Sequence, residues 1–257
     1  MGYPLHTILT VRRLQRKGVI SQVRFTGNDV FFNYGTGVGL RARCFPHSDL
    51  HVLQQILDQH EYGMAIDWMR SQQLDQDPLR IIDAGANVGY TSLFFLNAFP
   101  QASLVAVEPD PDNFKVLEYN LAHSGVRQPP RALSAALLSR SGIAVHINRQ
   151  EGDKKDWSFS VQPTTAASDI TSVCIADIVS QAAWDHIDIL KIDIEGSETD
   201  VFSEQADLSY LAKTRLVLIE IHDQMADRAL IQRLLVQKGF ALQEHSETTF
   251  AINQAFI

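Results

Sequence analysis

Two glycines and a distant acid form a pattern in this chain that is suited to hold a nucleoside. Residues 81–89 read IIDAGANVG, and Glu108 follows Gly89 by 19 residues, at the end of a second apolar run. Glycines at 85 and 89 let a strand turn sharply into a helix and let the backbone approach a ligand. A carboxylate at the tip of the next parallel strand accepts hydrogen bonds from both ribose hydroxyls. The spacing therefore predicts a nucleoside site with Glu108 at the ribose.

The glycine turn lacks the fingerprint of a pyrophosphate site. Dinucleotide-binding turns usually read G-x-G-x-x-G, so that amides at the helix start meet a pyrophosphate. Here Ala86 and Asn87 follow the first glycine and a third glycine is absent. This favours S-adenosylmethionine, a nucleoside without phosphate, as the cofactor. Two alternatives stay open: a nicotinamide-dependent oxidoreductase, which also holds ribose with an acid, and a binding protein that keeps the fold without turnover.

Strands and helices alternate from residue 80 onward, which indicates a parallel sheet covered on both faces. Strands are predicted at residues 80–84, 103–108, 132–138, 143–148, 187–192 and 215–221, and helices at 90–99, 177–183 and 227–238. A further helix is predicted to open at Pro111, with Asp110 as its N-cap. Strands at 240–244 and 249–257 follow the last helix, so the final strand is expected to run antiparallel. We predict an α/β, Rossmann-like, doubly wound sheet, mostly parallel with an antiparallel C-terminal strand.

The first 77 residues differ in pattern from the rest of the chain. Short β-like runs at residues 19–25, 30–34 and 38–43 are separated by turns that contain glycine. Ser48 and Asp49 then precede an apolar periodic segment with the signature of a capped helix, and a second helix is expected at 64–74. We therefore predict a small β-rich and helical cap region at 1–77 and a cofactor-binding domain at 78–257.

Composition argues against several classes of partner. The 257 residues carry a formal net charge of −8, so the chain lacks the basic surface that binds phosphate backbones. We therefore expect a small-molecule acceptor and no nucleic acid. With only two cysteines, and no apolar run of signal-peptide or membrane-spanning length, the protein is expected to be soluble and cytoplasmic, without membrane contact. No pattern indicates an oligomeric state.

Acidic residues gather directly behind the apolar run at 187–192. Asp193, Glu195 and Glu198 follow this run, and His222 follows the next predicted strand. Ligands of open α/β sheets bind at the carboxyl edge of the strands. These four side chains are therefore expected at the same edge of the sheet as the glycine turn.

Three segments together resemble the FkbM-type family of S-adenosylmethionine-dependent methyltransferases. They are residues 81–89, the run Glu108-Pro109-Asp110, and Lys191-Ile192-Asp193-Ile194-Glu195-Gly196-Ser197-Glu198. The resemblance extends from about residue 48 to the C-terminus and leaves residues 1–47 outside. It implies a class I methyltransferase sheet and transfer of a methyl group, in most members to oxygen. The expected acceptor is a hydroxyl of a small molecule, such as a sugar or a secondary metabolite.

The resemblance also assigns residues to the cofactor. The methionine end would be surrounded by the glycine turn and the helix behind it, at Asp83, Gly85, Ala86, Asn87, Gly89 and Thr91. Glu108 would hold the ribose with Pro109 beside it, and Ser134 and Ala135 would lie beside the adenine. Asp193 would face the methyl group.

Methyl transfer from a sulfonium is an in-line displacement, so holding the acceptor oxygen about 3 Å from the methyl carbon should supply most of the acceleration. The hydroxyl also loses a proton, which makes a nearby base useful. We predict Asp193, Glu195 and His222 as the catalytic residues, with His222 as a base. Asp193 as a helix cap, Glu195 and Glu198 as solvated acids, and His222 as a structural residue stay open as alternatives. Mg²⁺ is possible between the carboxylates, but no metal is expected.

Three other groups of residues have patterns for which a structural role is an alternative to a functional one. Cys44, His47 and His51 have a spacing that suggests zinc, but a fourth ligand is missing, so a structural role is expected. Trp157 and Phe159 lie in a long polar segment and form either a lid or ordinary packing. The basic residues from Arg12 to Lys17 are expected to form a solvated helix face.

Overall fold

A seven-stranded sheet forms the centre of this computed structural model, which describes residues 3–148, 160–166, 168, 170–203 and 205–256. The strand order is β13-β14-β12-β11-β4-β5-β6. The strands are β4 (Arg80–Ala84), β5 (Ser103–Val107), β6 (Arg131–Leu133), β11 (Ile187–Ile192), β12 (Thr214–Glu220), β13 (Phe240–His245) and β14 (Thr248–Asn253). Neighbouring strands pair in parallel except at β14, which is antiparallel to both of its neighbours. The predicted class I methyltransferase sheet is confirmed.

Helices cover both faces of this sheet, because alternate residues of each strand point to opposite sides. In β4, Ile81 joins the core that contains α4 (Tyr90–Ala98) and α5 (Pro111–Ala122). Its neighbour Ile82 joins the opposite core, with α6 (Ile175–Gln181), α7 (Glu198–Val201), a 3-10 turn η3 (Ser209–Lys213) and α8 (Arg228–Gln237). Helix α4 is apolar nearly all round and lies buried between the sheet and the N-terminal region.

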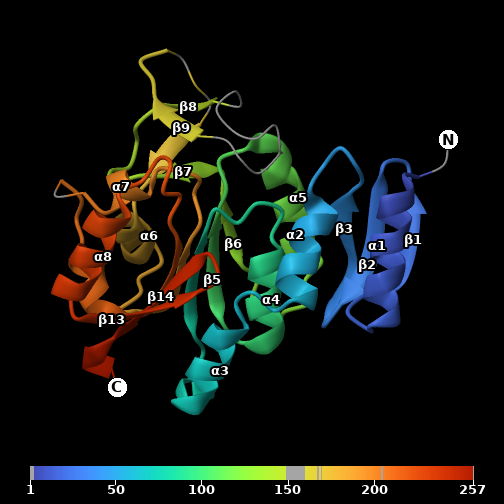
Figure 1. Cartoon of the computed structure of the whole chain (residues 1–257), viewed down its shortest axis with the longest axis horizontal. Coiled ribbons are helices and arrows are strands. Elements are labelled where there is room, and N and C mark those ends of the chain that lie inside the picture. Colours follow the sequence, from blue (N-terminus) through green and yellow to red (C-terminus); the bar gives the residue numbers. More distant parts are fainter. Residues whose placement is uncertain (1–2, 149–159, 167, 169, 204, 257) are drawn as a thin grey trace.

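The N-terminal region lies beside α4 and α5, at the blue end of the chain in Figure 1. It contains α1 (Leu5–Arg16), a three-stranded antiparallel sheet of β1 (Ser21–Thr26), β2 (Asp29–Tyr34) and β3 (Gly37–Arg43), then α2 (Asp49–Leu53), a π-helix η1 (Gln54–Asp58), α3 (Gly63–Ser71) and a 3-10 turn η2 (Leu74–Gln76). Its apolar side chains and those of α4 belong to one continuous core. The domain boundary at residue 77 stays a prediction.

Three predicted segments differ from the structure. The strand predicted at 132–138 is interrupted at Ser134, where the chain leaves the large sheet and continues as β7 (Ala135–Leu137), paired in parallel with β10 (Thr171–Val173). The polar segment after residue 148 is not loop throughout, because β9 (Ser160–Pro163) pairs with β8 (Val145–Asn148). The C-terminal strand ends at Asn253 and is followed by the 3-10 turn η4 (Gln254–Phe256). Trp157 and Phe159 lie outside the described residues.

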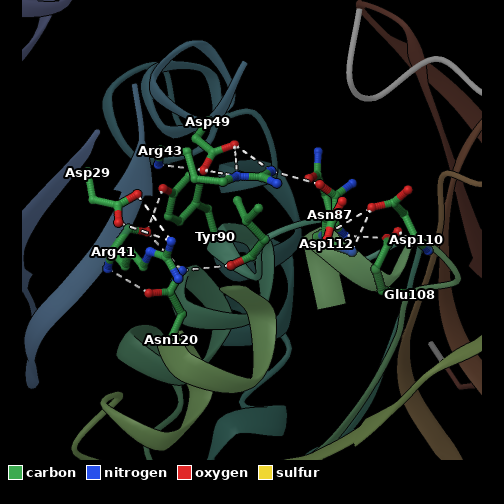
Figure 2. A network of polar contacts seen from close by, with 12 residues as sticks. Asp29, Arg41, Arg43, Asp49, Asn87, Tyr90, Glu108, Asp110, Asp112 and Asn120 are labelled. Atoms are coloured by element: carbon green, nitrogen blue, oxygen red, sulfur yellow. Dashed lines mark hydrogen bonds and ion pairs between the residues drawn. The ribbon is translucent and has the colours of Figure 1, made fainter. Parts of the chain in front are cut away.

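The two predicted helix caps have different outcomes. Asp110 caps α5 as predicted, since its side chain accepts hydrogen bonds from the backbone N–H groups of Asp112 and Asn113 at 3.0 and 2.9 Å. Ser48 occupies the predicted N-cap position of α2, but its side chain makes no cap hydrogen bond. The next residue, Asp49, is buried and accepts hydrogen bonds from the Arg43 guanidinium (Figure 2). That ion pair fixes the start of α2.

The described part of the chain contains no helix that is both long and apolar enough to cross a bilayer. The basic residues Arg12, Arg13 and Arg16 of α1 are exposed, as predicted. Lys17, just past the end of α1, contacts Asp58 at the end of η1 with an N–O distance of 2.7 Å.

Candidate functional site

One cavity of about 620 Å³ opens at the carboxyl ends of β4, β5, β11 and β12. It brings together nine of the residues predicted for the site: Gly85, Ala86, Asn87, Thr91, Glu108, Pro109, Asp193, Glu195 and His222. Three others, Asp83, Gly89 and Ser134, are not among the residues that line it. Ser134 is exposed at the end of β6. The assignment of individual residues to the cofactor stays a prediction.

The glycines of the turn after β4 are required by packing within the protein. Gly85 has φ +75°, and a Cβ there would overlap the backbone carbonyl of Asp193. Gly89 has φ +91°, and a Cβ there would lie 2.8 Å from Cδ1 of Leu117 on α5. Asn87 also has a positive φ of 50°, a conformation that asparagine tolerates better than most residues. The turn is therefore pressed against the acidic loop on one side and α5 on the other.

Glu108 is nearly fully buried at the end of β5 and faces the same turn (Figure 2). Its Oε2 accepts a hydrogen bond from the Asn87 amide at 2.8 Å, and Oε1 accepts one from the Asp110 amide at 2.9 Å. Burial raises the pKa of Glu108 to about 7, although these two hydrogen bonds favour the charged form. Each carboxylate oxygen has a second lone pair with which to accept a ligand hydroxyl.

Asp83 lies beside a buried lysine of the cavity wall. It is fully buried, accepts a hydrogen bond from Ser92 Oγ at 2.6 Å, and lies 3.3 Å from the Nζ of Lys191. Lys191 also donates to the carbonyl of Gly85 at 2.8 Å and lies 3.5 Å from Asp193 Oδ2. Burial disfavours its charge, but the carboxylates of Asp193 and Asp83 outweigh burial and raise the pKa of Lys191.

Lys191 therefore links the glycine turn to the acidic loop, and no role was predicted for it. The signal that could have identified it is a charged residue within the otherwise apolar end of β11, because a buried lysine needs charged partners.

The acidic loop after β11 surrounds the imidazole of His222. Glu198 is fully buried and its Oε1 lies 2.7 Å from Nδ1 of His222. On the cavity side, Nε2 lies 3.3 Å from Glu195 Oε2, 3.6 Å from Glu220 Oε1 and 4.0 Å from Asp193 Oδ1. Glu195 adopts a positive φ of 53°, which is uncommon for a residue with a Cβ.

Several alternatives for these acids can now be decided. Glu198 is not a solvated acid, because it is buried against His222. Asp193 does not cap the next helix, since Ser197 occupies the N-cap position of α7. Its carboxylate instead lies between Lys191 and the His222 ring.

The electrostatics of His222 argue against its predicted role as a base. Burial alone would lower its pKa, but the hydrogen bond with Glu198 and the negative charges of Glu195 and Asp193 outweigh burial and raise it above the usual value. A raised pKa favours the protonated ring in the free protein, and a protonated ring has no lone pair with which to accept the hydroxyl proton. Burial and the neighbouring Asp193 raise the pKa of Glu195 to about 7, against the lowering effect of His222.

Glu220 and Glu61 also line the cavity, and neither carried a predicted role. Burial and the charge of Asp193 raise the pKa of both Glu220, at the end of β12, and Glu61, just before α3. Glu220 could have been identified from its position at the tip of a buried strand, next to His222. Nothing in the pattern around Glu61 indicates that the cap region would bring it to the same cavity.

A polar network holds the cap region against α4 and α5 (Figure 2). The backbone carbonyl of Arg41 accepts hydrogen bonds from Tyr90 Oη at 3.0 Å and from Asn120 Nδ2 at 3.1 Å. The side chain of Arg43 bonds to Asp49 and to Asn113 Oδ1, both at 2.8 Å or less. As a result, Val52, Gln55, Ile56, Glu61 and Tyr62 of the cap form part of the cavity wall.

Within the described residues, Cys44, His47 and His51 do not converge as metal ligands, in line with the structural role predicted for them. Cys44 is buried at the end of β3 and is a free thiol.

Comparisons with known proteins identify methyltransferases. The methyltransferase FkbM domain matches residues 83–247. The chain is 27% identical to methyltransferase sdnD of Sordaria araneosa, over 74% of this chain and 81% of the relative. It is 30% identical to 2-O-methyltransferase NoeI of Sinorhizobium fredii (strain NBRC 101917 / NGR234), over 58% and 65% of the two chains. It is 26% identical to 31-O-demethyl-FK506 methyltransferase FkbM of Streptomyces tacrolimicus, over 66% and 76%.

Among solved structures, magnesium protoporphyrin IX methyltransferase from Synechocystis PCC 6803, with bound S-adenosylmethionine, is 11% identical with a TM-score of 0.44, over 79% of this chain and 84% of that one. The family match covers the glycine turn, Glu108 and the acidic loop, and it favours methyl transfer over the nicotinamide alternative. The chain belongs to the FkbM methyltransferase family.

Proposed function

We propose that this protein transfers the methyl group of S-adenosylmethionine to a hydroxyl oxygen of a small-molecule acceptor. The observation that carries the proposal is a single cavity with the Gly85 turn and Glu108 on one side and Asp193, Glu195 and Glu220 on the other. Its volume of about 620 Å³ is typical of small-molecule sites. Transfer to oxygen is supported by the names of two relatives, a 2-O-methyltransferase and a methyltransferase of 31-O-demethyl-FK506.

The cofactor would lie against the glycine turn, with its ribose hydroxyls donating to Glu108. In the reaction the acceptor oxygen forms a bond to the methyl carbon while the sulfur–carbon bond breaks, which leaves S-adenosylhomocysteine. The protein contributes mainly by holding the two reactants in line. The hydroxyl proton passes to one of the carboxylates on the acceptor side, where Glu195 and Glu220 face the cavity.

The direct test supplies cofactor labelled with ¹³C at the methyl group, together with a panel of sugars and hydroxylated metabolites. We expect the label on an acceptor oxygen, identified from its carbon chemical shift and from mass spectrometry. Glu195→Gln should lose most of the turnover and retain S-adenosylhomocysteine binding. A label on nitrogen would contradict the hydroxyl acceptor. Cofactor binding without any transfer, to the panel or to fractionated cell extract, would favour the non-catalytic alternative.

A further inference from the structure

Four side chains from two strand ends converge at the acceptor side of the cavity. The Nε2 of His222 lies 3.3 Å from Glu195, 3.6 Å from Glu220 and 4.0 Å from Asp193. One donor atom from each of Asp193, Glu195 and His222 lies within 4.8 Å of the other two. Over the described ranges of the chain, no second set of three such side chains comes together.

These spacings match the ligands of one divalent cation. Oxygen and nitrogen ligands bind Mg²⁺ or Mn²⁺ at about 2.1 to 2.3 Å, so octahedral neighbours lie roughly 3 Å apart and opposite ligands roughly 4.5 Å apart. The three distances from Nε2 fall between those limits. The four side chains are 21 to 29% exposed, so the cavity can reach them while most of each is shielded from bulk water.

The orientation of His222 is a second observation that points to a ligand. A histidine that binds a metal nearly always donates its other ring N–H to a carboxylate or carbonyl, which fixes the tautomer and the ring. Glu198 has this position, with Oε1 2.7 Å from Nδ1 and the side chain fully buried. The remaining nitrogen, Nε2, is thereby directed at the three carboxylates, and a cation bound there would displace the proton that Nε2 carries in the free protein.

We propose that Asp193, Glu195 and His222 bind a divalent cation, with Glu220 beside them and with Mn²⁺ or Mg²⁺ as the best match to this oxygen-rich set. The role of the cation rests on the proposed function: it would bind the acceptor hydroxyl and make its proton easier to lose. The methyl group still moves from sulfur to oxygen, and the proton leaves to water or to an unligated carboxylate oxygen. This reverses the expectation from the sequence, which favoured no metal.

The test measures binding of Mn²⁺ to the full chain, using electron paramagnetic resonance to count free Mn²⁺, with and without S-adenosylhomocysteine. We expect one saturable Mn²⁺ per chain at submillimolar concentration, displaced by excess Mg²⁺. Glu195→Gln and His222→Asn should each weaken binding by about tenfold or more. The matched control is Glu247→Gln, which removes a carboxylate from the same cavity but none of the proposed ligands. It should change Mn²⁺ affinity less than threefold.

Absence of saturable binding at millimolar Mn²⁺ would overturn the inference, as would equal weakening in the control and in both ligand variants. Thermal unfolding and S-adenosylhomocysteine titration of the same samples show whether each variant is folded. They also separate the two proposals. A protein that binds S-adenosylhomocysteine but not Mn²⁺ has no metal site and keeps its proposed function, whereas one that binds Mn²⁺ but not S-adenosylhomocysteine contradicts the proposed function.

Discussion

Replacing Glu108 by glutamine tests the ribose assignment and its pH dependence together. In the structure both carboxylate oxygens already accept a backbone N–H, and both keep a lone pair for a ribose hydroxyl. Glutamine keeps one such oxygen and puts an amide N–H₂ where the other was. One hydrogen bond to a charged acceptor is lost, which is about 1.5 to 3 kcal/mol. We therefore expect S-adenosylhomocysteine to bind roughly 10- to 150-fold more weakly.

The wild-type protein should also lose cofactor affinity in acid. Burial raises the pKa of Glu108 to about 7 in the unliganded protein. Ribose hydroxyls donate to the carboxylate, so the complex should have a lower pKa than the free protein. Affinity is then complete well above pH 7 and falls as pH drops through 7, by about tenfold between pH 8 and pH 6. Glu108→Gln should show no such slope.

Isothermal titration calorimetry with S-adenosylhomocysteine at pH 6, 7 and 8 measures both effects. The control is Glu118→Gln, an exposed acid on α5, which should match the wild type at each pH. Glu108→Gln with wild-type affinity at pH 8 would refute the ribose assignment. A variant that binds weakly but keeps the full acid slope would show that another group causes the pH dependence.

Two further predictions concern stability and are checked by urea or thermal unfolding. Gly85→Ala should cost about 3 to 5 kcal/mol, because its Cβ meets the Asp193 carbonyl and φ is +75°. Gly142→Ala, with φ +79° and open space around it, should cost only about 1 to 2 kcal/mol, so equal losses would contradict the packing argument. Arg43→Met should cost about 3 to 5 kcal/mol by leaving buried Asp49 without its guanidinium. Adding Asp49→Leu should recover part of that loss, and a double variant no more stable than the single one would count against it.

Most of the sheet could be predicted because each central strand is a short apolar run between turn residues. The glycine turn and Asp110 then identified the edge where ligands bind. The sequence pattern did not indicate which residues of different elements contact each other. The helix signature at Ser48 and Asp49 is local, whereas the Arg43 partner of Asp49 lies on another element. The strand through Ser134 divides because Ala135 and its neighbours pair with β10 instead of β5.

The sequence predicted which residues lie in the candidate site better than it predicted what each of them does. Asp193, Glu195 and His222 do lie together, but four carboxylates within 4.0 Å of the His222 ring favour its protonated form over the predicted base role. The number of carboxylates around the ring depends on how β12 packs beside the acidic loop. The spacing of residues along the chain does not reveal this. The resemblance implied a cofactor contact for Asp83. In the structure its carboxylate instead lies beside the buried Lys191.

The wall that the cap contributes to the cavity has an evolutionary consequence. Gln55, Ile56, Glu61 and Tyr62 reach the cavity from outside the sheet, and Gln55 and Ile56 come from a π-helix, a form that often marks functional sites. Substitutions at these positions can change which acceptors enter the cavity without altering the residues proposed to bind the methyl donor. Grafting this segment between paralogues should therefore exchange acceptor preference while donor recognition stays with the recipient scaffold.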